Sequence, residues 1–453
     1  MHPDQEHHID YPCPRVPLEV CQEIIDVVGA HARSDPDSAE HEPFCIQYIV
    51  VDWRPTLVAC ASVCKAWHVR SLRHLLVQVW LSSRRQIVSL SNLLRQHRDI
   101  QTGIRHVAVH GLEPDRPNNL TTRNLHYFDT FVLMLARQLP NITSLSLLDG
   151  HWKVACMVAK NTKYLALHTT LTHLRLRNVT FTTASHFASL LSALPNLVYI
   201  NCEDVTCRQK QLISQLPQSA HTNLREVLLD EPVDDAIVNT LGKFGAVAAV
   251  VDTLSSPDDA NSYPRLLDAY SPSLRYLNID WDSERELIDL SPQARLTALS
   301  LQFTRSIVDI PDFAKVAATL STITSNVISR IYIRFSCGNL AHMDEDEWAM
   351  TFLDKLEHDD SLRRIDELLS GPNFENIEQS GVWFEISMEA SCHARLMALT
   401  KSKEYWTQLL DKRMPQAAER KILEGAFDTW EMNAVEYGEE PRPPSRGKLE
   451  LDK

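Results

Sequence analysis

Three features are scarce in this 453-residue chain: glycine, long apolar runs and paired cysteines. With 12 glycines there is neither a glycine-rich phosphate loop nor a Gly-x-Ser-x-Gly elbow, which disfavours nucleotide cofactors and serine-hydrolase chemistry. No apolar stretch approaches the length of a bilayer span, and the N-terminus lacks a basic region followed by an apolar run. We therefore expect a cytoplasmic or nuclear protein that is neither secreted nor inserted in a membrane.

Metal and catalytic motifs are also missing. The 10 cysteines are scattered singly in apolar surroundings, as is typical of reduced, buried thiols. Neither Cys-x-x-Cys nor His-Glu-x-x-His occurs, and the acidic run at 344–347 lacks the glycine turn of a calcium loop. We predict no cofactor, no metal and no catalytic residue. An enzyme with a site assembled from distant residues stays open as an alternative, for example His168, His173 or His186 with Cys202.

The charge balance limits the kinds of partner. The formal net charge is −14, so the overall field opposes nucleic acid and weakly favours basic partners. The hydrophobic content of 44% is ample for one large domain and one small one. We expect protein partners and no nucleic acid.

Apolar residues recur at helical spacing in three segments near the N-terminus. The first segment begins at Pro17, which suits the first turn of a helix. Its apolar stripe comprises Leu18, Cys21, Ile24, Ile25 and Val28. A second helix, beginning near Thr56, carries Leu57, Cys60, Ala61, Cys64 and Trp67. A third, around 70–80, carries Leu72, Leu75, Leu76 and Val79. The pattern predicts a three-helix unit whose remaining exposed apolar groups require a partner.

The start Pro17-Leu18-Glu19 and the run Val63-Cys64-Lys65-Ala66-Trp67 give residues 14–80 a resemblance to an F-box. The resemblance implies docking on the Skp-family adaptor of SCF-type ubiquitin ligases and, through it, on cullin. The positions that match adaptor-facing or core positions are Pro17, Leu18, Ile24, Leu57, Val63 and Trp67. Residues 30–53 are longer than the usual connection and indicate a loop insertion. In the alternative interpretation, these residues only form the core of a small helical domain.

An apolar triplet Φ-x-x-Φ-x-Φ recurs through the middle of the chain. The triplets are Ile104-Val107-Val109, Ile142-Leu145-Leu147, Leu171-Leu174-Leu176, Leu197-Ile200-Cys202, Leu224-Val227-Leu229, Leu274-Leu277-Ile279, Leu296-Leu299-Leu301 and Ile328-Ile331-Ile333. Val247-Val250-Val251 reads as a degenerate strand between two of them. From Ile142 to Leu224 the triplets start 26 to 29 residues apart, and they resemble the strands of leucine-rich repeats.

Helical periodicity between the triplets predicts return helices at 127–139, 183–194, 234–244 and 310–320. In Leu139-Pro140-Asn141 and Leu194-Pro195-Asn196 the proline ends the helix and the asparagine follows in the turn. Alternating strands and helices of this kind predict a curved solenoid of parallel strands. A generic α/β alternation is the alternative.

The C-terminal third is expected to lose the repeat. A helical stretch from the acidic run to Leu369, a last strand over 382–388 and one or two helices over 404–433 are expected. The fold class is thus α/β: an F-box of three helices, an irregular leucine-rich-repeat-like solenoid and a mainly helical C-terminal cap. The expected divisions are a disordered N-terminus (1–13), the F-box-like domain (14–80), the repeat domain (81–390), a helical region (391–436) and a disordered tail (437–453).

Taken together, the chain is similar to F-box proteins with leucine-rich-repeat bodies, a kind abundant in fungi of the mushroom group. The resemblance implies a non-catalytic ubiquitin-ligase subunit that holds an unidentified target through the solenoid and brings it near a charged conjugating enzyme. A repeat scaffold that works outside a ligase is the alternative. Tyr199, Tyr276 and Trp281 are candidate target contacts, with core packing as their other interpretation.

Overall fold

The computed structural model describes eleven stretches of the chain. These are residues 17–31, 54–111, 124–152, 161–209, 223–244, 247–252, 262–280, 287–303, 313–337, 345–389 and 404–430. The expected N-terminal and C-terminal disorder, most of the insertion at 30–53, and Trp281 lie outside these residues. The chain forms two compact units, Met1–Thr182 with Ser189–Leu197 (unit 1), and Thr183–Ala188 with Val198–Lys453 (unit 2).

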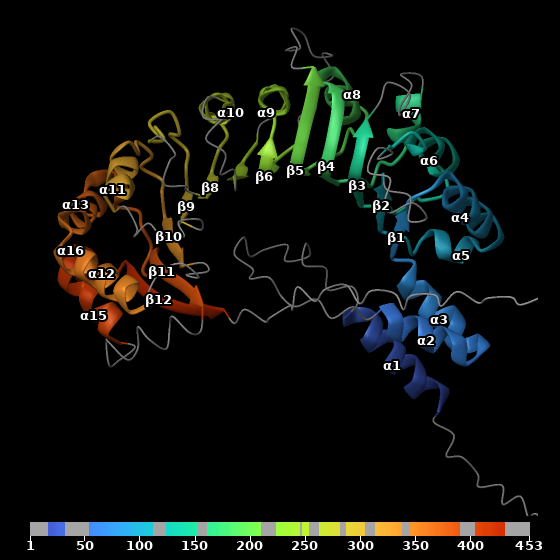
Figure 1. The fold of residues 1–453 in the computed structure, drawn as a ribbon, viewed down its shortest axis with the longest axis horizontal. Helices are drawn as coiled ribbons and strands as arrows, with labels where there is room; N and C mark the ends of the chain where they lie inside the picture. Colours follow the sequence, from blue (N-terminus) through green and yellow to red (C-terminus); the bar gives the residue numbers. More distant parts are fainter. Residues whose placement is uncertain are drawn as a thin grey trace, which may run out of the picture. The chain divides into compact units, whose positions relative to one another are not determined.

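Unit 1 consists of three helices followed by strands that alternate with helices (Figure 1). The helices are α1 (Leu18–His31), α2 (Arg54–Val63) and α3 (Lys65–Leu75). Behind them come β1 (Gln78–Leu81), α4 (Arg84–Gln96), α5 (Arg98–Gln101), β2 (His106–His110), α6 (Phe128–Leu135), β3 (Ser144–Trp152), α7 (Thr162–Leu165) and β4 (His173–Thr183). Helix α8 (Ala184–Ser192) is divided between the two units.

Unit 2 continues the alternation to the end of the described chain. Its first elements are β5 (Tyr199–Gln209), β6 (Glu226–Val233), α9 (Asp235–Leu241), β7 (Ala249–Asp252), α10 (Ser262–Tyr270), β8 (Tyr276–Asp280), β9 (Ala298–Phe303), α11 (Phe313–Ser321) and β10 (Arg330–Cys337). The last are α12 (Glu345–His358), α13 (Asp360–Leu369), the 3₁₀ helix η6 (Pro372–Phe374), β11 (Val382–Glu389), α15 (Glu404–Arg413), α16 (Pro415–Glu419) and β12 (Leu423–Trp430).

Within each unit the strands are parallel and follow chain order. In unit 1, β1 pairs with β2, β2 with β3, and β3 with β4. In unit 2 each strand from β5 to β12 pairs with the next. Figure 1 shows α9, α10 and α11 along one side of the strands of unit 2. This is the expected repeat of one strand and one return helix, in which each repeat packs on the repeats next to it in sequence.

The triplets form the core between strands and return helices. All eight lie where expected: their first residues precede β2, β3, β4, β5, β6, β8, β9 and β10, and their other two residues lie in these strands. Every one of these side chains is at most 2% exposed. Val247-Val250-Val251 likewise leads into a real strand, β7. Burying a large aliphatic side chain contributes about 1.5–3 kcal/mol, so the triplets supply much of the stability.

The asparagines that follow Leu-Pro tie consecutive repeats together. Asn141 Nδ2 donates to Thr102 O at 3.0 Å, and Asn196 Nδ2 donates to Thr169 O at 2.7 Å. Both acceptors belong to the turn of the preceding repeat, so these side chains satisfy carbonyl groups that no strand pairs. The expected return helices are also present, as α6, α8, α9 and α11.

The structure differs from the sequence-based expectation at both ends of the repeat. Trp80, expected in a third helix reaching residue 80, lies in strand β1, which pairs with β2. The expected helix from Thr56 to Trp67 is two helices, because Cys64 is extended (φ −159°) and caps the start of α3. The expected helical region over 391–436 contains strand β12, which pairs with β11 over eight residues, so the described end of the chain is not simply a helical cap.

None of the helices in the described stretches combines the length and apolarity that crossing a bilayer requires.

Candidate functional site: the helical head and the outward sheet faces

Helices α1–α3, here called the helical head, pack around a small core. Cys21 and Ile25 of α1 and Leu57 of α2 are at most 8% exposed, and Ser71 of α3 is fully buried. Gly29 of α1 lies so close to the His74 ring that a Cβ atom would meet it at 2.3 Å. A side chain at position 29 would therefore push α1 away from α3.

A carboxylate fixes the angle between α1 and α3. Asp26 of α1 accepts hydrogen bonds from Arg70 Nε, at 2.7 Å, and from Arg70 Nη2. His74 Nε2 lies 2.8 Å from Asp26 Oδ1. The bonds from Arg70 lower the pKa of Asp26 to about 2 against the opposing effect of burial, with His74 adding to the decrease. The bidentate geometry orients the two helices in addition to attracting them.

The helical head exposes an unusual number of branched apolar side chains. On α1, Val20, Ile24 and Val27 are 42%, 48% and 57% exposed. Their i, i+4, i+7 spacing places them on one helix face, beside the buried stripe. Val58, Val63 and Val69 on α2 and α3 are between 49% and 61% exposed. Such a concentration on one small helical unit is typical of a surface that another protein covers.

The predicted adaptor-binding residues divide into exposed and buried ones. Pro17, Ile24 and Val63 are exposed and Trp67 is half-buried, whereas Leu57 is 1% exposed and belongs to the core of the head. Leu18 begins α1, and its side chain lies outside the described structure. Ile24, predicted on one apolar stripe with Cys21 and Ile25, is exposed, whereas those two side chains are buried. Val20, Val27, Val58 and Val69 were missed, although a second apolar spacing in α1 (20, 24, 27) marks the exposed face.

The second candidate site is the outward face of the unit 2 sheet, opposite the return helices. Strand register aligns one outward residue from each strand in a single row. The described side chains of this row, from β5 to β12, are Asn201, Leu228, Asn278, Ser300, Tyr332, Trp383 and Glu424. The Tyr332 and Trp383 rings lie 6.3 Å apart, and Trp383 Nε1 donates to Ser380 O at 2.7 Å.

Polar groups surround this row. Arg334 Nη2 donates to Glu385 Oε2 at 2.9 Å, with side chains only 20% and 15% exposed. Asn278 and Ser300 are at most 3% exposed, and their Oδ1 and Oγ atoms have no hydrogen-bond partner in the described structure. An unpaired buried polar atom costs about 1–3 kcal/mol, so the row includes hydrogen-bonding capacity that the chain itself does not use. The predicted contact Tyr276 lies near this row and is half-buried, and burial raises its pKa. Tyr199 is also half-buried, on β5.

Unit 1 presents a different outward face. His106, Ser144 and His173 share one row, and Arg175 and Arg177 follow on β4. Beside them, Asp149 binds His110 Nε2 through Oδ2 at 2.9 Å and accepts from Asn178 Nδ2 through Oδ1 at 2.7 Å. Asp149 and Asn178 both have positive φ, which these residue types tolerate better than most. This cluster joins the carboxyl end of β2 to the middle of β3 and β4.

Two of the residues proposed for a distributed enzyme site, Cys202 and His168, lie in the core of the described structure. Cys202 is fully buried and burial raises its pKa, which opposes formation of a thiolate. His168 is 3% exposed beside Phe131, and burial lowers its pKa. Among the described residues, no group of three or more His, Cys, Asp or Glu side chains is placed to hold a metal ion.

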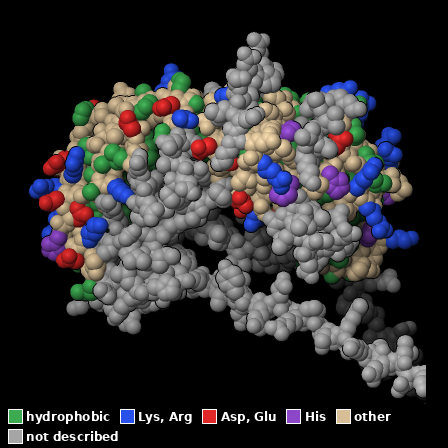
Figure 2. Space-filling view, turned by 45° about the horizontal axis from the view of Figure 1, so that its top comes forward, with side chains coloured by type: hydrophobic (Ala, Val, Ile, Leu, Met, Phe, Trp, Pro, Cys, Tyr) green, Lys and Arg blue, Asp and Glu red, His purple; other side chains and the backbone are tan. Residues whose placement is uncertain are grey.

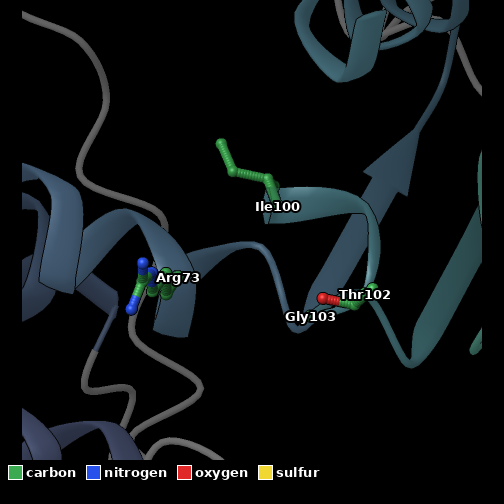
Figure 3. A pocket seen from close by; sticks show the side chains of 4 residues that line it. All are labelled: Arg73, Ile100, Thr102 and Gly103. Atoms are coloured by element: carbon green, nitrogen blue, oxygen red, sulfur yellow. The ribbon is translucent and has the colours of Figure 1, made fainter. Parts of the chain in front are cut away.

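One pocket lies in unit 1, away from these residues. It has a volume of about 390 Å³ and is lined by Arg73 from α3 and by Ile100, Thr102 and Gly103 at the end of α5 (Figure 3). These four described lining residues include no acid and base pair for proton transfer. The face in Figure 2 shows basic, acidic and histidine side chains interspersed with scattered hydrophobic ones.

Comparison with known proteins gives limited guidance. No family model and no curated protein matches the chain. Among solved structures, the leucine-rich-repeat-containing protein LegL7 from Legionella pneumophila is similar with a TM-score of 0.35 and 12% identity, over 75% of this chain and 87% of that one. The functional domain of InlJ from Listeria monocytogenes is similar with a TM-score of 0.20 and 12% identity, over 66% and 61%. Neither likeness bears on function at these scores.

Proposed function

We propose that this protein selects target proteins for an SCF-type ubiquitin ligase in the cytoplasm or nucleus. The helical head docks on a Skp-family adaptor, and through it on cullin, while the outward faces of the repeat strands hold the target. The protein itself forms no bond: it raises the concentration of target lysines near a charged conjugating enzyme.

The observation that carries the proposal is the exposed apolar stripe of α1, in a head whose sequence resembles an F-box. Val20, Ile24 and Val27 gain from burial against a partner, since each apolar Å² removed from water contributes about 25 cal/mol. Val63, in the F-box-like run at the end of α2, is a further exposed apolar side chain of the head. A head that served only to close the end of a repeat would have polar residues at these positions.

The test is co-purification of the full chain with its host's Skp adaptor and cullin, comparing wild type with Ile24→Asp and Val27→Asp. Both side chains are about half exposed, so these changes remove docking without removing core packing. Val327→Asp, at a 44% exposed position in unit 2, is the matched control. We expect the two head variants to lose the adaptor and the control to keep it.

Two results of this co-purification would change the proposed function. If wild type does not bind the adaptor, the ligase role is wrong and a repeat scaffold with another partner remains. If the adaptor binds but cullin does not co-purify, the head functions outside a ligase.

A further inference from the structure

The two outward sheet faces carry opposite charge. At outward positions of β5, β6, β11 and β12, unit 2 has the acidic residues Glu203, Glu226, Asp230, Glu385 and Glu424. Its outward basic residues include Arg208 on β5 and Arg330 and Arg334 on β10; Arg330 pairs with Glu378 at 3.2 Å, and Arg334 pairs with Glu385 at 2.9 Å. In unit 1, the outward positions of β2 and β4 include His106, His173, Arg175 and Arg177, and the acidic residue beside them, Asp149, pairs with His110.

Aromatic rings lie at the acidic end of unit 2. Trp383 stands level with Tyr332 on one side and with Glu424 on the other. The hydrogen bond from its Nε1 to Ser380 O, at 2.7 Å, holds the indole in a fixed orientation. A cationic side chain over an aromatic face, with a carboxylate beside it, is a favourable arrangement for Lys and, more often, Arg.

The same row offers acceptors for hydrogen bonds. Asn201 and Asn278 are at most 7% exposed, and the Oδ1 atom of each has no partner in the described residues. These two oxygens are buried, so the acceptor that a bound segment reaches in this row is the Glu424 carboxylate. A guanidinium or ammonium group supplies donors and no acceptor, so it matches this carboxylate better than another carboxylate does. The net charge of −14 also attracts a cationic segment at long range.

We infer that the outward face of unit 2, centred on Tyr332, Trp383 and Glu424, binds an extended, arginine- or lysine-rich segment of the target protein. This inference rests on the proposed function, because it names the kind of target segment that the ligase subunit holds. A cationic side chain of the segment lies over Trp383 and pairs with Glu424, and further cations meet the acidic residues of β5 and β6.

Binding of two short fluorescein-labelled peptides to the full chain tests the inference, one of alternating Arg and Ser and the other of alternating Glu and Ser. We expect the Arg–Ser peptide to bind to wild type more tightly than the Glu–Ser peptide, with an affinity that falls as salt rises. Trp383→Leu and Glu424→Gln should each weaken this binding about two- to fivefold, the range of an exposed cation–π contact or ion pair. Fluorescence anisotropy reads out both peptides.

Matched controls separate this site from the general charge of the protein. Glu367→Gln removes an exposed carboxylate from α13, and Trp80→Leu removes a 47% exposed indole from β1. Both should leave binding of the Arg–Ser peptide unchanged. Equal losses in the control variants, or equal binding of the Glu–Ser peptide, would overturn the inference. If Trp383→Leu fails to fold, Glu424→Gln still decides, because it preserves the size of the side chain.

The two proposals fail in different ways. A wild-type protein that co-purifies with the adaptor but ignores the Arg–Ser peptide contradicts only the basic-segment inference. A protein that binds the peptide through Trp383 but never binds the adaptor keeps the docking surface and loses the ligase role.

Discussion

A buried aspartate in helix α13 should be a sensitive position for the stability of unit 2. Asp366 of α13 is 1% exposed, and its two carboxylate oxygens accept backbone N–H groups of α16, from Gln416 at 3.1 Å and Ala417 at 2.8 Å. These N–H groups belong to the first turn of a helix, where no carbonyl of the helix can receive them. The carboxylate therefore joins α13 of one repeat to α16 of the next.

The cost of Asp366→Ala follows from these two bonds. A hydrogen bond to a charged group contributes about 1.5–3 kcal/mol, and the two share one side chain, so we expect a loss of about 3–5 kcal/mol in the free energy of unfolding. Asp366→Asn keeps one acceptor oxygen and should cost about half as much. Asp359→Ala is the matched control, since Asp359 caps α13 through a bond to Ser361 N at 2.7 Å in a half-exposed setting. A cap of that kind contributes about 1 kcal/mol.

Urea unfolding followed by circular dichroism, together with hydrogen exchange of the C-terminal repeats, measures the effect. Hydrogen exchange is needed because repeats can unfold locally from one end. If Asp366→Ala costs no more than Asp359→Ala, the two N–H groups find other acceptors and the reasoning is wrong.

Three further outcomes are expected. Asn196→Ala removes the bond to Thr169 O and should cost about 1 kcal/mol by urea unfolding, whereas an unchanged midpoint would mean that water replaces it. Burial lowers the pKa of His168 in the folded state, so the contribution of His168 to stability is full above the unfolded pKa of 6.5 and declines as pH falls below that value. Urea unfolding at two pH values should show a slope of at most about 1.4 kcal/mol per pH unit in wild type and a smaller slope in His168→Leu. An equal slope in the variant would mean that another group causes it. The pKa of Asp26, lowered to about 2, keeps its links to Arg70 and His74 intact at neutral pH and loosens them only as pH falls from about 4 towards 2. Asp26→Ala should therefore lower the melting temperature and adaptor affinity together at neutral pH, and unchanged melting would contradict its bracing role.

The repeat body was predictable because its signal is apolar periodicity. The positions of Leu171, Leu174 and Leu176 determine both the strand and its buried face, and the structure leaves all three at most 1% exposed. The first and last strands were harder to predict. Strand β1 is only four residues long and comes soon after helix α3. Its Val79 lies at helical spacing from the apolar residues of that helix, so the sequence pattern continues the helix into the strand. In β12, Leu423 and Ala426 are separated by Glu424 and Gly425, which obscures the two-residue alternation of a strand. The β12 strand is specified mainly by pairing with β11, a long-range contact that local pattern does not report.

The outward faces were beyond prediction for another reason. Which outward residues share a row depends on register, and register depends on the lengths of the intervening helices and loops. Trp383 and Glu424 are 41 positions apart in the chain, yet they are direct neighbours across β11 and β12. Sequence could identify the tyrosines and tryptophans but could not place an acidic residue beside one of them.

The helical head shows why burial must be known before docking can be tested. Leu57 and Ile24 both belong to the segment that resembles an F-box in sequence, yet Leu57 is 1% exposed and Ile24 is 48% exposed. A charge at Leu57 would abolish binding by unfolding the head whether or not the residue touches an adaptor, because a buried unpaired charge is costly. A charge at Ile24 leaves Cys21 and Ile25 packed, so loss of binding there reports on the surface alone. The two stripes of α1 thus assign folding and docking to different residues, and only substitutions on the exposed stripe can distinguish an F-box from a helical domain that merely resembles one.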